Sequence, residues 1–418
     1  MKIGFFLSEY PVLSETFILN ELYYLQQSGV QGHVFYESHG SSRVSHPREK
    51  EIGFAKTHIF AGESLHKHPW TVLVTHALLF VRHPIRYLRG VILLTQIFNW
   101  ANLRHFVLAG MLIKIIISSN VNLLYVHDAE GISLIGLFCK FFSGLPGGII
   151  FHTFGLFSDT AFLRQKVMNY DFTLFQSKYS RQYAVEFFSV DEKIKAHMHV
   201  VSSTGVDVQF FVPRRKVAKG QTKNPTVRLV SVGRIEKMKG FDKLIHAIAL
   251  LKQKHIAIQC LIVGYGSQRK TLQKLIYRLR LTDRVKLVGP MGHTDRFRAL
   301  LQDADIFVLP SEVDLSGDRD MQPNAIKEAM ATGCLVLTSN LGGIDEVIVS
   351  DINGFLLKST DPRDIAHAIE EILQLSKKGK QKIQERARRT IVDNYEAQKT
   401  NALLIDVFRK YLRDDFIE

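Results

Sequence analysis

Residues 305–338 read DIFVLPSEVDLSGDRDMQPNAIKEAMATGCLVLT, and this stretch decides the fold class of the chain. Its start, 305–309, is a short apolar run typical of a buried strand. Pro323 suits the start of a helix over 324–332, which a glycine ends, and a second apolar run follows at 335–338. A strand, a helix and a strand in this order predict a parallel sheet with helices on its faces.

The same alternation of apolar runs and amphipathic segments continues on both sides of this stretch. Strands are predicted at 228–232, 257–263 and 285–287, and helical periodicity separates them, for example over 268–278. Another series of strands comes earlier, at residues 2–7, 33–37, 122–127, 149–153, 172–176 and 199–202. Residues 213–226, which are polar and basic with two prolines, are therefore a predicted linker between two domains.

The chain is predicted to hold two doubly wound α/β domains, in residues 1–212 and 227–390, followed by a C-terminal helix within 391–418. Its 418 residues allow two or three domains of ~150 residues. Two such domains joined by a short linker place a cleft between the carboxyl ends of their sheets, and this cleft is the expected ligand position.

The composition excludes several classes of protein. With 46% hydrophobic and 22% charged residues, the chain is not extensively disordered. Its three cysteines are far apart, which excludes a disulfide scaffold and favours the reduced cytoplasm, and no signal peptide is predicted. Lys and Arg number 54 against 40 Asp and Glu, and the net charge of +14 admits nucleic acid, an anionic membrane or a phosphorylated substrate.

Cations and glycines follow the first two strands of the second domain. Gly233 and Arg234 come directly after one strand, and Lys239 lies in the same loop, just before Gly240 opens the next helix. Two cations beside a helix start are a candidate anion site, although solvated surface charge is the alternative. Gly264 and Gly266 follow the next strand, where they either let the backbone approach a ligand or form a tight structural turn.

Polar residues also follow the next two strands. Ser311, Asp320 and Glu328 lie in the loop and helix after 305–309, where carboxylates can accept hydrogen bonds from sugar or ribose hydroxyls. Gly342 and Gly343 come after the strand at 335–338 and would present backbone N–H groups toward the same place.

A metal site is the alternative interpretation of the acidic pairs in this region. Asp303 and Asp305 have the spacing of metal ligands, and so do Asp318 and Asp320. The first pair also fits a helix end and a strand start, and no metal or other cofactor is expected.

Together these segments resemble the family 4 glycosyltransferases. The motifs that carry the resemblance are Gly233-Arg234…Lys239-Gly240, Val263-Gly-x-Gly266, Asp320-x7-Glu328-Ala-Met-Ala-x-Gly333 and Gly342-Gly343-Ile-x-Glu346. The N-terminal Tyr10-Pro11-x-x-Ser14-Glu15-Thr16-Phe17-Ile18 resembles the subgroup that builds exopolysaccharides such as colanic acid. Motifs in this order extend over nearly the whole chain.

The resemblance implies a GT-B fold, with two Rossmann-like domains facing each other across a cleft, and retaining transfer from a nucleotide-diphosphate sugar. Arg234 and Lys239 then hold the donor diphosphate, Asp320 contacts the transferred sugar and Glu328 binds the ribose. The helix in 391–418 is expected to pack back on the first domain. The other implied donor-binding residues are Gly233, Gly264, Gly266, Ser311, Gly342 and Gly343, and the implied acceptor-side residues are Ser14 and Thr16.

Three departures from the family pattern bear on activity. Asp320 replaces the usual Glu, Met321 replaces the usual Gly, and Phe154 occupies the place of a histidine that the family commonly has. His152 on a strand would point to the same side as Phe154, and His127 ends the preceding strand, so both are candidate catalytic residues. A catalytically silent homologue that binds a sugar nucleotide or acts as a scaffold, and an epimerase on the same fold, are the alternatives.

The segment 66–117 interleaves apolar runs with cations. Its apolar runs at 71–81, 91–98 and 106–117 are shorter than the ~20 residues that span a bilayer, so none is a predicted membrane span. The segment either forms core helices with cations on their exposed faces or docks the first domain on the anionic inner leaflet, where a glycan or lipid-linked acceptor would be met. We expect a cytoplasmic, peripherally membrane-associated protein, and nucleic acid is the least expected partner.

Overall fold

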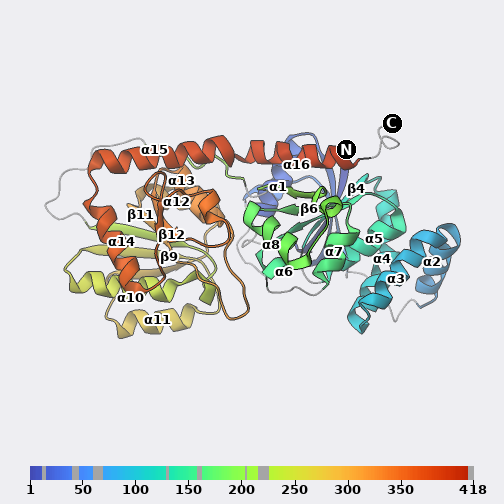
Figure 1. The fold of residues 1–418 in the computed structure, drawn as a ribbon, viewed down its shortest axis with the longest axis horizontal. Helices are drawn as coiled ribbons and strands as arrows, with labels where there is room; N and C mark the ends of the chain where they lie inside the picture. Colours follow the sequence, from blue (N-terminus) through green and yellow to red (C-terminus); the bar gives the residue numbers. More distant parts are fainter. Residues whose placement is uncertain are drawn as a thin grey trace. The chain divides into compact units, whose positions relative to one another are not determined.

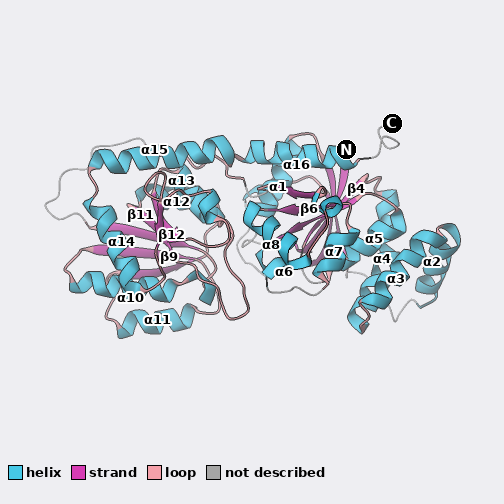
Figure 2. Cartoon of the chain, in the orientation of Figure 1, coloured by secondary structure: helices cyan, strands magenta, loops and turns pink. Residues whose placement is uncertain are grey.

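The computed structural model describes residues 1–11, 16–39, 47–59, 69–128, 131–157, 162–202, 205–214 and 226–412. The chain divides into two compact units. Unit 1 comprises Met1–Ser203 with Asn401–Glu418, and unit 2 comprises Thr204–Thr400. Each unit contains one parallel sheet with helices packed against it (Figures 1 and 2).

Unit 1 is built on a seven-stranded sheet in the order β3-β2-β1-β4-β5-β6-β7. The strands are β1 (Lys2–Glu9), β2 (Gln31–Ser38), β3 (Ala55–His58), β4 (Leu123–His127), β5 (Gly147–Phe151), β6 (Phe172–Phe175) and β7 (Met198–Val200). Central β1 pairs in parallel with both β2 and β4, and its buried side chains alternate between the two faces of the sheet. On one face Phe5 packs in a core with Leu22 of α1 (Thr16–Gln27) and Phe408 of α16 (Ala397–Tyr411), and on the other face α5 (Ile132–Ser143) lies against Val126 through Gly136.

The helices of unit 1 connect these strands. They are α1 (Thr16–Gln27), α2 (Pro69–Arg82), α3 (Pro84–Gln96), α4 (Trp100–Ser118), α5 (Ile132–Ser143), α6 (Thr153–Phe157), α7 (Leu163–Asn169), α8 (Lys178–Phe188) and α9 (Glu192–Lys195), with the 3-10 turn η2 (Pro47–Glu51). Three of them, α2, α3 and α4, are inserted in succession between β3 and β4. Helix α4 packs on α5, so the insertion is attached to the face of the sheet that α5 covers.

Unit 2 is built on a six-stranded parallel sheet in the order β10-β9-β8-β11-β12-β13. The strands are β8 (Val227–Val232), β9 (Ile258–Val263), β10 (Val285–Gly289), β11 (Ile306–Leu309), β12 (Leu335–Ser339) and β13 (Phe355–Leu357). The helices are α10 (Phe241–Gln253), α11 (Arg269–Arg278), α12 (Asp295–Asp303), α13 (Asn324–Ala331), α14 (Pro362–Gln374) and α15 (Lys377–Asn394), with the 3-10 turns η4 (Lys237–Lys239) and η5 (Ile344–Glu346). Helix α16 (Ala397–Tyr411) begins in unit 2 and belongs to unit 1 from Asn401 onward. Figure 1 shows α10 and α11 on one side of the sheet and α13 and α15 on the other. All the strands are parallel, so their carboxyl ends lie along one edge.

The domain boundaries differ from the predicted ones. Residues 205–212 were expected in the first domain, but Val206, Val208 and Phe211 lie in the core of unit 2. Arg388 of α15 holds this segment by donating to the carbonyl oxygens of Val208 (2.8 Å) and Phe211. The predicted break at residue 391 falls inside α15, and the residues that pack in the core of unit 1 come later, in the second half of α16.

Two local predictions are corrected. The strand expected at 149–153 ends at Phe151, because Thr153 begins α6. The apolar run expected at 106–117 belongs to the longer helix α4, and this helix, Trp100–Ser118, is long and apolar enough to cross a membrane by length and composition. The length argument against a span is therefore wrong for α4, although 44% of its most apolar window is buried inside the structure.

Candidate functional site

The carboxyl edge of the unit 2 sheet carries a buried polar cluster. Lys239 stands at the end of η4, just after β8, while Ser311 and Asp320 lie in the loop that follows β11. The Lys239 ammonium forms an ion pair with Oδ1 of Asp320, and the Ser311 hydroxyl donates to Oδ2 of the same carboxylate. The structure thus brings together three predicted residues, separated by up to 81 positions in the sequence, at one point.

Arg234 lies beside this cluster and differs from Lys239 in exposure. Its side chain is 55% exposed, and its guanidinium Nη2 is 3.9 Å from Oδ2 of Asp318. Burial raises the pKa of Asp318, and the charge of Arg234 acts in the opposite direction. An exposed guanidinium next to a buried ammonium is suited to binding an anion that arrives from solvent.

Glu328 lies on α13, the helix that follows the loop of Ser311 and Asp320. Its Oε1 is 3.0 Å from Nε2 of His293, which comes from the loop between β10 and α12, and both side chains are almost buried. The sequence analysis predicted Glu328 but did not include His293. The signal was available, because His293 follows a predicted strand end just as Arg234 and Ser311 do.

Two of the predicted glycines are required by close backbone approaches. Gly264 has φ +151°, and a Cβ there would clash with the carbonyl oxygen of Gly233. Gly342 has φ +58°, and a Cβ there would clash with the carbonyl oxygen of Asp320. The glycine turn after β12 is therefore in contact with the loop that carries the buried carboxylate.

Two amides close to this turn were missed by the sequence analysis. The Gln322 side chain is almost buried and donates from Nε2 to the carbonyl oxygen of Gly343 over 3.2 Å. Its Oε1 and the Oδ1 of Asn324 are buried acceptors with no hydrogen-bond partner among the described residues. Buried acceptors without partners are costly unless a ligand donates to them, so these amides extend the candidate site.

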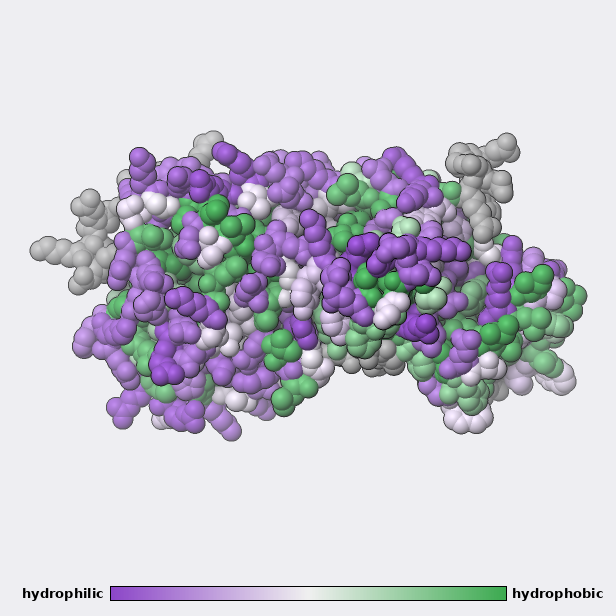
Figure 3. Space-filling view, viewed as in Figure 1, coloured by the Kyte–Doolittle hydropathy of each residue, from purple (hydrophilic) through white to green (hydrophobic). Residues whose placement is uncertain are grey.

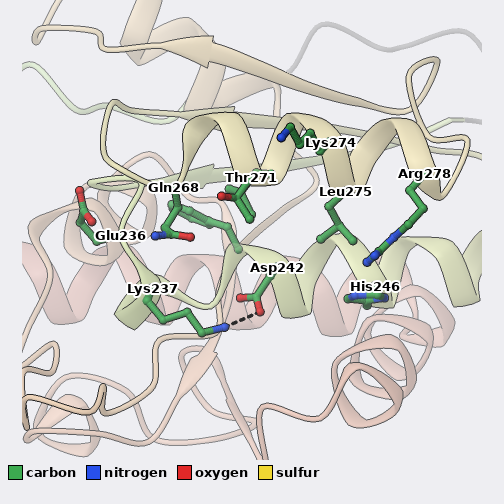
Figure 4. A pocket seen from close by; sticks show the side chains of 11 residues that line it. Glu236, Lys237, Asp242, His246, Gln268, Thr271, Lys274, Leu275 and Arg278 are labelled. Carbon is green, nitrogen blue, oxygen red and sulfur yellow. Dashed lines mark hydrogen bonds and ion pairs between the residues drawn. The ribbon is translucent and has the colours of Figure 1, made fainter.

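A pocket of about 510 Å³ in unit 2 does not coincide with this site. It lies between α10 and α11, as Figure 4 shows, and its lining includes the ion pair of Lys237 with Asp242 (2.7 Å). None of the predicted donor-binding residues lines it. We therefore place the candidate site at the carboxyl edge of the sheet, where the predicted residues converge.

In unit 1, the two predicted histidines lie in a buried chain of hydrogen bonds. Oε1 of Glu21 is 3.1 Å from Nε2 of His127, and Nδ1 of His127 is 3.0 Å from Nε2 of His152. Nδ1 of His152 is 2.7 Å from the side-chain amide of Gln176. Burial, with the neighbouring His127, holds the pKa of His152 well below its ordinary value, so this imidazole is neutral at pH 7.

Glu21 and Gln176 were not predicted, although each carries a signal in the sequence. Glu21 is a charged residue on the apolar stripe that includes Ile18 and Leu25 of α1, and Gln176 follows the end of β6 directly. A charge on a buried helical face needs a partner inside the protein, which here is His127.

The other predicted residues of unit 1 are placed differently from expectation or lie outside the described residues. His152 follows β5 and is not part of the strand. The prediction that His152 and Phe154 point to the same side of a strand is therefore wrong. The side chain of Phe154 lies outside the described residues, as do Ser14 and the side chain of Thr16.

The acidic pairs considered as metal ligands have other partners. Asp303 pairs with Arg214, and Asp305 accepts from the backbone N–H of Arg228 at 2.8 Å. Within the described part of the chain, there is no group of three or more His, Cys, Asp or Glu side chains that could hold a metal ion.

Comparison with known protein families finds similarity over the second half of the chain. The family model described as glycosyl transferases group 1 matches residues 214–390. WcaL of Escherichia coli (strain K12), named as a colanic acid biosynthesis glycosyltransferase, is 31% identical over 209 residues, which are 50% of each chain. The amylovoran biosynthesis glycosyltransferase AmsK of Erwinia amylovora is 36% identical over 140 residues, which are 34% of each chain. The chain spans about half the length, or less, of these curated relatives.

Solved structures share the fold of the whole chain. A glycosyltransferase from Rickettsia africae ESF-5 has a TM-score of 0.69 and 17% identity, and the match covers 99% of each chain. Anabaena Alr3699/HepE, solved in complex with UDP, has a TM-score of 0.69 and 16% identity, covering 98% of this chain and 100% of that one. These likenesses confirm the predicted class of two Rossmann-like α/β domains. The match to the family model of glycosyl transferases group 1 thus covers residues 214–390, which include all the strands of unit 2.

Proposed function

We propose that the chain is a retaining glycosyltransferase of bacterial exopolysaccharide, capsule or lipopolysaccharide assembly, using a nucleotide-diphosphate sugar as donor. The observation that carries this proposal is the cluster of Lys239, Asp320 and Ser311 beside the exposed Arg234, at the carboxyl edge of a glycosyl transferases group 1 domain. The curated relatives WcaL and AmsK, which are named for colanic acid and amylovoran biosynthesis, support a role in polysaccharide assembly.

The proposed chemistry depends on the charge of the leaving group. As the bond between the sugar C1 and the diphosphate breaks, negative charge develops on the diphosphate, and in this proposal Arg234 and Lys239 neutralise it without a metal ion. The acceptor oxygen forms the new bond to C1 from the same face, and its proton goes to the departing phosphate oxygen. Asp320 holds Lys239 in position through their ion pair.

A uridine-diphosphate sugar is the first donor to test. HepE has been solved with UDP and with UDP-glucose, and a mutant of S. aureus TarM and the pneumococcal O-GlcNAc transferase GtfA have been solved in complexes that contain UDP. The acceptor is a glycan or a lipid-linked sugar, met at the cytoplasmic face of the membrane.

Donor binding without transfer is the second candidate function. Both oxygens of Asp320 already accept hydrogen bonds from side chains of the protein, and this internal pairing favours a structural role for the carboxylate. A protein of this kind binds the donor and leaves it unchanged.

The test has a binding arm and a transfer arm. Thermal shift with UDP-glucose and a guanosine-diphosphate sugar identifies the donor, and Arg234→Gln is expected to lose that shift while the exposed Arg389→Gln of α15 keeps it. Transfer is then followed with membrane extracts as acceptor, with and without EDTA, and the anomeric configuration of the product is read by NMR.

The outcomes separate the candidates. Transfer that survives EDTA and retains configuration supports the proposal. A thermal shift with no transfer to any extract supports the binding protein. An unchanged donor shift in Arg234→Gln contradicts the assignment of the diphosphate site.

A further inference from the structure

The helical insertion of unit 1 has an unusual charge pattern. Residues 64–127 contain no Asp or Glu. Within α2, α3 and α4 the cations are Arg82, Arg86, Arg89, Arg104 and Lys114, and all of them except Arg86 are exposed. The insertion therefore presents a surface whose formal charges are all positive.

Helix α2 turns an apolar face outward. Trp70, Val74 and Val81 recur at helical spacing on one side, and their side chains are 76%, 53% and 74% exposed. The opposite side of α2 is anchored by His76, whose ring nitrogens lie 3.1 Å from the Tyr87 hydroxyl of α3 and 3.2 Å from the carbonyl oxygen of Val107 in α4. The orientation of α2 is thus set by buried polar contacts, which leave the apolar side exposed.

The apolar surface continues on α3 and at the start of α4. Ile85, Leu88 and Ile92 form an exposed stripe on α3, with the exposed Arg89 next to it. The rings of Phe98 and Trp100, also exposed, lie 5.9 Å apart between their centroids at the turn into α4. In Figure 3, green apolar atoms crowd this part of unit 1, with purple polar atoms among them.

We propose that the outward faces of α2 and α3, with the turn into α4, form a docking surface for an anionic lipid bilayer. Exposed apolar side chains over two adjacent helices exceed what a soluble surface ordinarily carries, and tryptophan and basic residues are typical of helices that lie in a membrane interface. The proposal concerns binding to lipid alone and does not depend on the donor assigned above.

The charge pattern argues against a second copy of this chain as the occupant. A two-fold contact of this surface with itself places like surfaces together, and Arg82 and Arg89 would meet cations with no acidic partner in the insertion. An anionic bilayer offers both negative headgroups for these guanidinium groups and acyl chains for Trp70 and Val81.

Vesicle sedimentation of the full chain tests the proposal. We expect the protein to sediment with phosphatidylcholine vesicles that contain phosphatidylglycerol, and to bind much less to phosphatidylcholine alone. Arg82→Gln with Arg89→Gln is expected to weaken binding on the order of 30-fold. The matched control is Lys382→Gln with Arg389→Gln, two exposed cations of α15, and it is expected to bind like the wild type.

A second pair of variants tests how much the exposed apolar side chains contribute to vesicle binding. Trp70→Ser with Val81→Ser is expected to abolish sedimentation, while Tyr277→Ser, a 78% exposed aromatic residue of unit 2, is expected to leave it unchanged. Circular dichroism and the thermal shift with donor confirm that each variant is folded, so loss of lipid binding is distinguishable from failure of the donor site.

Two results would overturn the proposal. One is equal sedimentation of wild type and both α2–α3 variants. The other is a self-associating protein that the Trp70→Ser/Val81→Ser variant makes monomeric in analytical ultracentrifugation, with no vesicle binding by either form.

Discussion

At the scale of single residues, the buried ion pair of Lys239 and Asp320 is the centre of the candidate site in unit 2. Both side chains are almost buried, so each charge depends on the other for compensation. Removing either charge is therefore expected to affect both stability and the proposed binding of an anion. Activity measurements on single variants would mix these two effects.

A double-mutant cycle separates them. Lys239→Ala is expected to cost on the order of 3–5 kcal/mol of unfolding free energy, because it leaves the Asp320 carboxylate buried without a counter-ion. Adding Asp320→Ala is expected to recover much of that loss. Urea unfolding followed by circular dichroism measures the four proteins, and additive effects of the two substitutions would contradict a coupled pair.

Gly342 offers a second test at the residue scale. Gly342→Ala is expected to destabilise unit 2 through its positive φ and through the clash of the new Cβ with the carbonyl oxygen of Asp320. Gly289→Ala is the matched control, since its φ is +94° but nothing lies within 4 Å of the added Cβ. Both are expected to lose about 1 kcal/mol from φ strain, with a further loss for Gly342→Ala alone. Equal unfolding free energies of the two variants would exclude the contact with the Asp320 loop.

At the scale of helices and strands, the sequence predicted what depends on local pattern. The β11–α13–β12 unit was predicted correctly. Its strands are uninterrupted apolar runs, and a proline and a glycine mark the two ends of the helix. The edge strands β3 and β13 were missed, since they have four and three residues and are defined by pairing with β2 and β12. The segment 205–212 was misassigned because only tertiary contacts, such as those of Arg388, attach it to unit 2.

The candidate site was predictable to a similar degree. Residues that follow strands, such as Arg234 and Ser311, could be predicted because parallel strands bring their carboxyl ends to one edge. Of their partners, His293 also follows a strand and was overlooked, whereas Gln322 is identified only by its hydrogen bond to Gly343, which no local pattern encodes. His152 was predicted on a strand because the local pattern does not show where that strand ends. In the structure β5 ends one residue before His152, and α6 begins two residues after β5.

Helix α13 also contains a buried lysine that the proposed chemistry does not use. Lys327 is fully buried, and burial lowers its pKa to about 7, although Glu328 opposes the shift. Its ammonium lies 5.4 Å from the ring centroid of Tyr395. Burial thus disfavours the charged form of this lysine relative to the neutral amine.

Replacing this lysine is expected to change the pH dependence of stability. The folded-state pKa of Lys327 lies below its value of 10.5 in the unfolded chain, so the unfolded state binds more protons between these values and wild-type stability rises with pH above 7. Lys327→Met is expected to remove this rise and to be at least as stable as the wild type at pH 7. Urea unfolding at pH 7, 8 and 9 measures the difference, with the exposed Lys382→Met as control. Identical slopes in the three proteins would show that Lys327 does not titrate in this range.

At the scale of the whole molecule, unit 1 is expected to lose stability in acid because of its buried histidines. Burial lowers the pKa of several histidines of unit 1, namely His33, His76, His105, His152 and His199, the last to about 4. Glu37 opposes them, since burial raises its pKa to about 7. The histidines outnumber this one carboxyl group, so acidification is expected to change the stability of unit 1 mainly through the histidines.

The sign of the effect follows from proton binding. Each of these histidines has a folded-state pKa below its ordinary value of 6.5, so below pH 6.5 the unfolded chain binds more protons and unit 1 loses stability as the pH falls. Glu37 gains a proton in the folded state between pH 7 and 4.5 and reduces this loss. Pulse proteolysis in urea at pH 7, 6 and 5, with fragments mapped to each unit, is expected to show unit 1 weakening. His152→Gln is expected to reduce the slope by at most about 1.4 kcal/mol per pH unit, the effect of one proton. A unit 1 whose unfolding free energy is constant or rises from pH 7 to pH 5 would contradict the assignment of neutral, buried imidazoles.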